Sequence, residues 1–114
     1  MMRIVILESP YAGDVEANLA YARACMRESL LIGEAPMVSH ALYTQAGVLD
    51  DTKPEERRIG IEAGLAWGVA AEATVVYMDR GVSSGMRAGI MRAHKEGRPV
   101  EYRLLGGGTV LEAT

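Results

Sequence analysis

The sequence has no phenylalanine, one tryptophan and one cysteine among its 114 residues. A single cysteine, Cys25, excludes an internal disulfide and is typical of a reducing cytoplasm. Long hydrophobic runs are also missing: the first apolar run, Ile4 to Leu7, is too short for a signal peptide or a membrane span. Two distant histidines and one cysteine lack the spacing of metal ligands. We therefore expect a cytoplasmic protein with no metal, no cofactor and no membrane partner.

Positive charge is scarce as well. Twelve lysines and arginines stand against 15 aspartates and glutamates, which gives a formal net charge of -3. This balance disfavours binding to a nucleic acid polymer, because phosphate backbones select basic surfaces. The same charge balance is compatible with a small anionic ligand, since such a ligand needs only local positive charge. With 49% hydrophobic residues, the chain can bury the core of one domain over residues 1–114 without disulfide or metal.

Short apolar runs alternate with amphipathic helical patterns through most of the chain. Continuous apolar runs are typical of strands buried on both faces, and intervening helices favour a parallel sheet. We predict an α/β fold, a single-domain parallel sheet of the Rossmann-like or flavodoxin-like kind with four to five strands flanked by helices. The expected strands are residues 4–7, 35–38, 73–78 and 98–104.

Each expected helix has a recognisable start. Asp14 can cap the first helix, and Thr52 with Glu55 has the spacing of a capping box at the second. Ser83 or Ser84 can cap the third. Because a capping side chain satisfies an amide that the helix leaves unpaired, these positions predict where the helices begin.

Two connections stand out from this pattern. Residues 41–53 form a polar segment, long enough to indicate a functional loop such as a flap over a site. After the glycines at 106–108, we expect a short tail either to pair at a sheet edge or to remain mobile.

Ligands of a parallel α/β sheet gather beyond the carboxyl ends of its strands, where the polar loops 9–13, 39–43 and 79–87 are expected. The third loop also opens a helix, so the amides of Ser83 to Met86 and the helix dipole favour a phosphate or carboxylate. Arg87, in the first turn, could add a forked contact. The alternative is an ordinary serine-capped turn beside a surface arginine. We favour a nucleotide site.

Other polar side chains near these sheet ends have a ligand role and a structural alternative. Tyr11, among small residues, suits stacking on a base, or else packs within its turn. His40 suits an acid, a base or a phosphate donor, or else a histidine bonded to backbone. Asp79 can orient a ribose hydroxyl or merely end its strand. Asn18 would supply a further polar contact.

Short motifs follow one another in the order Pro10-Tyr11-Ala12-Gly13, Asn18, Gly33 with Pro36, Ser39-His40 and Ser84-Gly85. In this order they resemble the nucleoside 2-deoxyribosyltransferase-like superfamily, in particular its small phage and bacterial members. The resemblance runs from about Ile4 to Val100. It implies that Tyr11 belongs to the floor of a nucleoside site and that an acidic residue near Glu62 helps to hold the nucleoside.

The superfamily's transferases carry a glutamate nucleophile just inside the helix after the third strand. The matching position here is Arg87, or Gly89 under a shifted alignment. Neither guanidinium nor glycine can attack an anomeric carbon. The resemblance therefore implies a protein that binds a nucleotide or ribosyl phosphate without transferase chemistry. A phage could use it in the host cytoplasm to sequester or sense a nucleotide signal and so evade immunity. Relatives assemble as dimers or higher oligomers, so we expect a homo-oligomer.

Two other functions stay open. An N-glycosidase or deoxyribosyltransferase with a relocated carboxylate would use Glu62, Glu8 or Asp79, the last two as a pair with one general acid. A protein-interaction module would instead have its sheet-end cleft filled by residues 41–53. For the binding function, the candidate ligand-binding residues are Ser9, Pro10, Tyr11, Gly13, Asn18, His40, Tyr43, Glu62, Asp79, Ser83, Ser84, Gly85, Met86 and Arg87.

Overall fold

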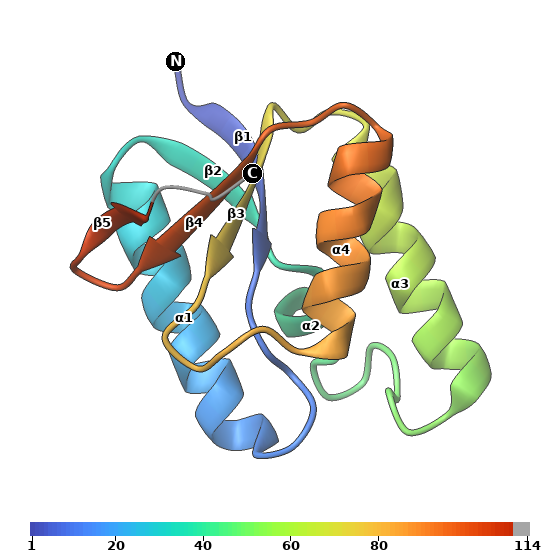
Figure 1. Cartoon of the computed structure of the whole chain (residues 1–114). Helices are drawn as coiled ribbons and strands as arrows, with labels where there is room; N and C mark the ends of the chain where they lie inside the picture. Colours follow the sequence, from blue (N-terminus) through green and yellow to red (C-terminus); the bar gives the residue numbers. More distant parts are fainter. Residues whose placement is uncertain (111–114) are drawn as a thin grey trace.

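The computed structural model, which describes residues 1–110, contains one sheet with the strand order β2-β1-β3-β4-β5 (Figure 1). The first four strands in this order are parallel, and β5 pairs antiparallel with β4 at the edge. The prediction of a parallel α/β sheet of four to five strands is confirmed. The bounds are β1 Arg3–Glu8, β2 Glu34–Met37, β3 Ala73–Tyr77, β4 Val100–Leu104 and β5 Gly108–Val110.

The tail predicted after the glycines thus pairs at a sheet edge as far as residue 110. Residues 111–114, the end of that tail and of the predicted domain, lie outside the described residues.

The helices cover the sheet in two separate layers (Figure 1). Helix α1 lies over one face and packs against β1, β2 and β3, whereas α3 and α4 lie over the other face. A single turn, α2, follows β2 and contacts α3. The bounds are α1 Val15–Leu31, α2 Ser39–Leu42, α3 Pro54–Gly68 and α4 Ser84–Lys95.

Two of the three expected caps are present. Asp14 accepts a hydrogen bond from the amide of Ala17, and Ser83 accepts one from the amide of Met86. The capping box at Thr52 was wrong. Helix α3 has Lys53 as its N-cap and no side-chain cap, and Thr52 bonds instead to Asp50. The physical reason is Pro54, which is favoured at the first helical position and so makes Lys53, one residue after Thr52, the N-cap.

The two faces of the sheet differ in how completely they are covered. On the α1 face, Val5 is fully buried and Leu7 is 2% exposed, and both belong to the same core cluster as Cys25. Side chains alternate along a strand, so Ile4, Ile6 and Glu8 lie on the α3 and α4 face. Ile4 is 40% exposed there. The incomplete cover on this face leaves room for a cavity.

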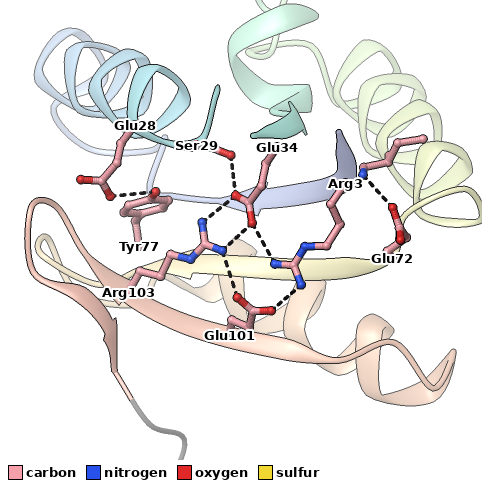
Figure 2. A network of polar contacts seen from close by, with 9 residues as sticks. Arg3, Glu28, Ser29, Glu34, Glu72, Tyr77, Glu101 and Arg103 are labelled. Atoms are coloured by element: carbon pink, nitrogen blue, oxygen red, sulfur yellow. Dashed lines mark hydrogen bonds and ion pairs between the residues drawn. The ribbon is translucent and has the colours of Figure 1, made fainter. Parts of the chain in front are cut away.

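A network of charged side chains crosses the α1 face (Figure 2). Arg103 binds both oxygens of Glu34, at 2.7 and 2.6 Å, and Arg3 bridges Glu34 and Glu101 at 2.8 Å each. Ser29 donates to Glu34 at 2.7 Å. Burial acts to raise the pKa of Glu34, but hydrogen bonds from Arg103, Ser29 and Arg3 outweigh it and lower the pKa to about 2. The network ties α1, β1, β2 and β4 together.

Across residues 1–110, no helix has both the length and the apolar character needed to cross a membrane.

Candidate functional site

A cavity of about 370 Å³ lies between α3 and α4 at the carboxyl end of β1. Its floor includes Ile6 and Glu8 from β1, and its walls include Ile61 of α3 and Gly89 of α4. Strand β1 has β2 on one side and β3 on the other, so the strand order reverses at this point. Open α/β sheets bind ligands at this kind of switch point, beyond the carboxyl ends of the strands.

Three of the predicted residues lie close together beyond the carboxyl end of β1. The Ser9 hydroxyl lies 3.1 Å from Nε2 of His40, and the Tyr11 ring meets the His40 ring edge-on at 5.9 Å. All three line the cavity. Gly64 of α3 lets α2 approach closely, because a Cβ at position 64 would lie 2.6 Å from the hydroxyl oxygen of Ser39.

The imidazole of His40 is neutral at pH 7. Burial lowers its pKa to about 4, against the attraction of Asp51, which acts to raise it. A neutral ring carries one donor nitrogen and one acceptor nitrogen. His40 can therefore exchange a hydrogen bond with Ser9 and still serve as a proton acceptor.

The first turn of α4 contributes a second group of predicted residues, Ser83 to Met86, all of which line the cavity. Ser83 and Met86 are joined by two hydrogen bonds. The amide of Met86 donates to the Ser83 hydroxyl, and the amide of Ser83 donates to the Met86 sulfur. Neither the amide of Ser84 nor that of Gly85 has an acceptor within the described part of the chain. Free amides at a helix N-terminus favour an anion.

The Glu8 carboxyl group packs against the backbone of α4. A Cβ at position 89 would lie 2.1 Å from Oε2 of Glu8, so only glycine permits this approach. Glu8 is half-buried and makes no hydrogen bond or ion pair with any residue in 1–110. Burial raises its pKa to about 8, although the charge of Arg98 opposes the rise. A carboxyl group with these properties suits general acid chemistry or donation of a hydrogen bond.

Sequence reasoning missed the cations of the cavity, which are Arg57, Arg92 and Arg98. Arg98 is held in place by hydrogen bonds to the Thr74 hydroxyl, the Gly68 carbonyl and Glu96, at 2.7 to 3.0 Å. Glu96 also pairs with Arg92 at 2.8 Å. Arg92 lies about one helical turn beyond Gly89, so helical spacing could have found it. Arg98 carries no local signal, because it reaches the cavity from the connection before β4.

Arg87 was predicted to hold the anion, but the structure does not bring it to the cavity. It is exposed, and the α4 residues that line the cavity beyond the first turn are Ala88, Gly89 and Arg92. Successive helical residues are about 100° apart, which turns the side chain of Arg87 away from Gly85 and Gly89. The positive charge at this site therefore comes from other arginines.

Asp79 and Asn18 serve the scaffold. Asp79 accepts from the Tyr21 hydroxyl at 2.5 Å and from the amide of Leu105, on the α1 side of the sheet. The structure therefore does not form the expected pair of Glu8 and Asp79, which lie on opposite faces. Asn18 donates to the carbonyls of Tyr11 and Ala12 and accepts from Arg80. It holds the first loop in place without lining the cavity.

Four other candidates also lie outside the cavity lining. Glu62 is exposed and pairs with Arg58 at 2.8 Å, and Tyr43 accepts a hydrogen bond from Trp67 at 2.8 Å. Pro10 is buried within the first loop, where Gly13 adopts a positive φ of 99°.

The expected flap takes a different form. Its first residues belong to α2, and of positions 43–53 only Asp51 lines the cavity, where it pairs with Arg57 at 3.3 Å. The loop therefore leaves the cavity open. Within the described residues, no cluster of three or more histidine, cysteine or carboxylate side chains could hold a metal ion.

Residues 3–103 match the family described as Domain of unknown function (DUF7768), and the chain belongs to that family. No curated protein and no solved structure matches the chain.

Proposed function

We propose that this member of the DUF7768 family binds a nucleotide or a related ribosyl phosphate in the cavity beside β1. The observation that carries the proposal is the meeting of free amides, an aromatic ring and a neutral imidazole around one cavity at the switch point of the sheet. Its volume of about 370 Å³ lies within the range of small-molecule sites, roughly 300–1,000 Å³.

The amides of Ser84 and Gly85 are the proposed phosphate ligands. They lie at the positive end of the α4 dipole and have no acceptor in the described part of the protein. Arg92 and Arg98 add positive potential to the same cavity, although Glu96 neutralises part of it. Arg87 has no place in the proposal, because it lies outside the cavity.

The base and the sugar of the ligand would contact residues beyond the carboxyl end of β1. The Tyr11 ring offers an apolar face for a base, and its orientation is fixed in part by the edge-on contact with His40. The Ser9 hydroxyl and the imidazole of His40 can exchange hydrogen bonds with ribose oxygens.

The test is calorimetry with the four ribonucleoside 5′-monophosphates, the matching nucleosides and ribose 5-phosphate. Ser84→Pro removes one proposed amide donor at a position where proline suits a helix. We expect it to weaken phosphate-bearing ligands about tenfold, which is the effect of losing one charge-assisted hydrogen bond. Arg87→Ala is the matched control and should bind as wild type. Failure of every phosphate-bearing compound to bind, or unchanged affinity in Ser84→Pro, would overturn the proposal.

Glu8 favours a second candidate, the hydrolysis of an N-glycosidic bond. Its carboxyl group occupies the space beside Gly89, which is one of the two positions that match the family nucleophile in the resemblance. As general acid, it would protonate the departing base while the bond from C1′ to nitrogen breaks; water then adds to C1′ and returns a proton to the Glu8 carboxylate. Release of free base from a nucleoside, abolished by Glu8→Gln, is the expected result. No release by wild type contradicts it.

We further propose that the protein acts in the cytoplasm as a homo-oligomer. Cys25 is buried and free, and Ile59, Ile61 and Trp67 leave 43 to 51% of their surface exposed along α3. Light scattering coupled to gel filtration tests the oligomer, and a monomer mass contradicts it.

The resemblance to phage proteins supports sequestering or sensing of a nucleotide signal as the biological role. An interaction module has less support, because residues 43–53 leave the cavity open.

A further inference from the structure

Glu8 is half-buried and makes no hydrogen bond with any residue in 1–110, and it lines the cavity, so a ligand can reach its carboxyl group from there. Strand alternation places its side chain on the α3 and α4 face, where the Gly89 backbone packs against the carboxyl group. Its neighbour in β3 is Val76, which is apolar and fully buried. Glu8 itself lines the cavity. The carboxyl group is therefore open to a hydrogen bond with a ligand in the cavity.

Charged and titratable groups reach the same cavity from every element around it. Besides Glu8, they are Arg98 before β4, Arg92 on α4, Arg57 on α3, Asp51 before α3, His40 on α2 and the Tyr11 hydroxyl in the loop after β1. Among them, Arg98 acts on Glu8 and favours its ionised form, but burial has the larger effect on the pKa. Arg98 is also held by Glu96, and Arg57 is paired with Asp51.

We propose that Glu8 meets the ligand as a neutral carboxylic acid and donates a hydrogen bond to an acceptor oxygen, which makes it a specificity-determining residue of this cavity. The inference rests on the proposed function. An ionised Glu8 would repel an anionic ligand and accept hydrogen bonds only, so the neutral form selects ligands that present an acceptor at this point. The acceptor is an oxygen of the phosphate, the sugar or a base carbonyl.

Because only the neutral form of Glu8 donates this hydrogen bond, ligand affinity falls when Glu8 ionises. The pKa of Glu8 in the free protein is raised to about 8 by burial. Below pH 8, Glu8 already carries its proton, so ligand binding takes up almost no proton from solution. Above pH 8, binding must restore the proton, so affinity falls by about tenfold per pH unit. A phosphate monoester keeps its charge of -2 through most of this range, since its second pKa is about 6.

The test compares wild type with Glu8→Gln at pH 7 and pH 9, using the four ribonucleoside 5′-monophosphates and ribose 5-phosphate. The side-chain amide of the Glu8→Gln variant has a nitrogen that donates at either pH, so this variant needs no proton uptake to bind. We expect wild type to bind about tenfold more weakly at pH 9 than at pH 7 and Glu8→Gln to bind equally at both. Glu62→Gln, at an exposed carboxylate outside the cavity, should behave as wild type.

The outcomes separate this inference from the proposed function. If no compound binds wild type at pH 7, both are overturned. If wild type binds but shows the same pH dependence as Glu8→Gln, or if Glu8→Gln loses binding at pH 7, only the role of Glu8 is overturned. The carboxyl ¹³C signal of Glu8 in wild type checks the same point without a substitution. It should report a protonated acid in the complex at pH 8.5, and an ionised one would contradict the inference.

Discussion

The α1 face of the sheet pairs its buried polar groups with one another, whereas the α3 and α4 face presents to a cavity polar groups that no other residue in 1–110 bonds. On the first face, Glu34 and Arg103 are bound to each other and to neighbours (Figure 2). On the second, Glu8 and the amides of Ser84 and Gly85 make no hydrogen bond within residues 1–110. Ser84 and Gly85 are exposed and Glu8 is half-buried, so these polar groups are accessible to a ligand that enters the cavity. We therefore regard one face as scaffold and the other as the candidate site.

Glu34→Ala should have the largest effect on stability, because it breaks the scaffold face. The substitution leaves Arg103, whose side chain is 6% exposed, without its main carboxylate. We expect the free energy of unfolding to fall by about 3 kcal/mol. Urea unfolding followed by circular dichroism measures the change. Glu62→Ala, which breaks an exposed pair with Arg58, should cost much less, because solvent screens surface pairs. Equal losses in the two variants would refute the contrast between a buried network and surface pairs.

Gly89→Ala tests the packing of Glu8 on the site face. The new Cβ would lie 2.1 Å from the Glu8 carboxyl oxygen, so we expect a loss of about 1–3 kcal/mol from overpacking. Gly85→Ala is the matched control in the same helix. Its Cβ meets only the Ser83 hydroxyl, at 3.9 Å, and alanine favours the helix by up to about 1 kcal/mol.

A double-mutant cycle sharpens this prediction. Adding Glu8→Ala to Gly89→Ala removes the collision, so the double variant should be more stable than the sum of the two single changes predicts. Thermal melts or urea midpoints measure the coupling. Additive effects would mean that Glu8 and Gly89 do not touch.

The pH dependence of stability provides a smaller test of the site face. The pKa of Glu8 in the folded protein is about 8, above its ordinary value of 4.5. Its contribution is therefore complete below pH 4.5 and is lost as the pH rises to 8, because the unfolded chain releases the proton first. Relative to Glu8→Gln, wild type should lose stability between pH 5 and pH 8.5, at up to about 1.4 kcal/mol per pH unit.

Urea unfolding of both proteins at the two pH values checks this difference. His40 acts in the opposite direction. Its pKa is lowered to about 4, so its contribution is lost as the pH falls from 6.5 toward 4. Because His40 is present in both proteins, its effect cancels in the comparison. A constant difference between wild type and Glu8→Gln would contradict the raised pKa of Glu8.

Arg87→Ala should have the smallest effect. The side chain is exposed and lies outside the cavity, so we expect a stability change within about 0.5 kcal/mol and no change in ligand affinity. The calorimetric titrations described above measure the affinity. A severalfold loss of ligand affinity would mean that Arg87 contacts the ligand. It would contradict the placement of Arg87 on the side of α4 that points away from the cavity.

The fold was predictable from sequence because its signals are local. Apolar runs at 4–7 and 73–78 marked the central strands, and Asp14 and Ser83 capped helices as expected. The capping box at Thr52 and Glu55 was wrong, because Pro54 begins the helix one residue later and makes Lys53 the N-cap.

About half of the candidate site was predictable, namely the loops at the ends of β1 and β3. The remainder depends on which way each side chain points. Glu8 and Asp79 both end strands but lie on opposite faces, and Arg87 and Arg92 share a helix but point in different directions. Arg98 reaches the cavity through its bonds to Thr74 and Gly68, which are far from it in sequence. Local patterns do not contain this information.

The most direct test of the central claim is an amide ¹H-¹⁵N spectrum recorded while ribonucleoside 5′-monophosphates are added. We predict that the amide signals of Ser84 and Gly85 shift most, together with those of residues after the carboxyl end of β1 such as Tyr11. Signals of α1 should stay in place. Shifts confined to the α1 face, or no shift at Ser84 and Gly85 at saturating nucleotide, would contradict it.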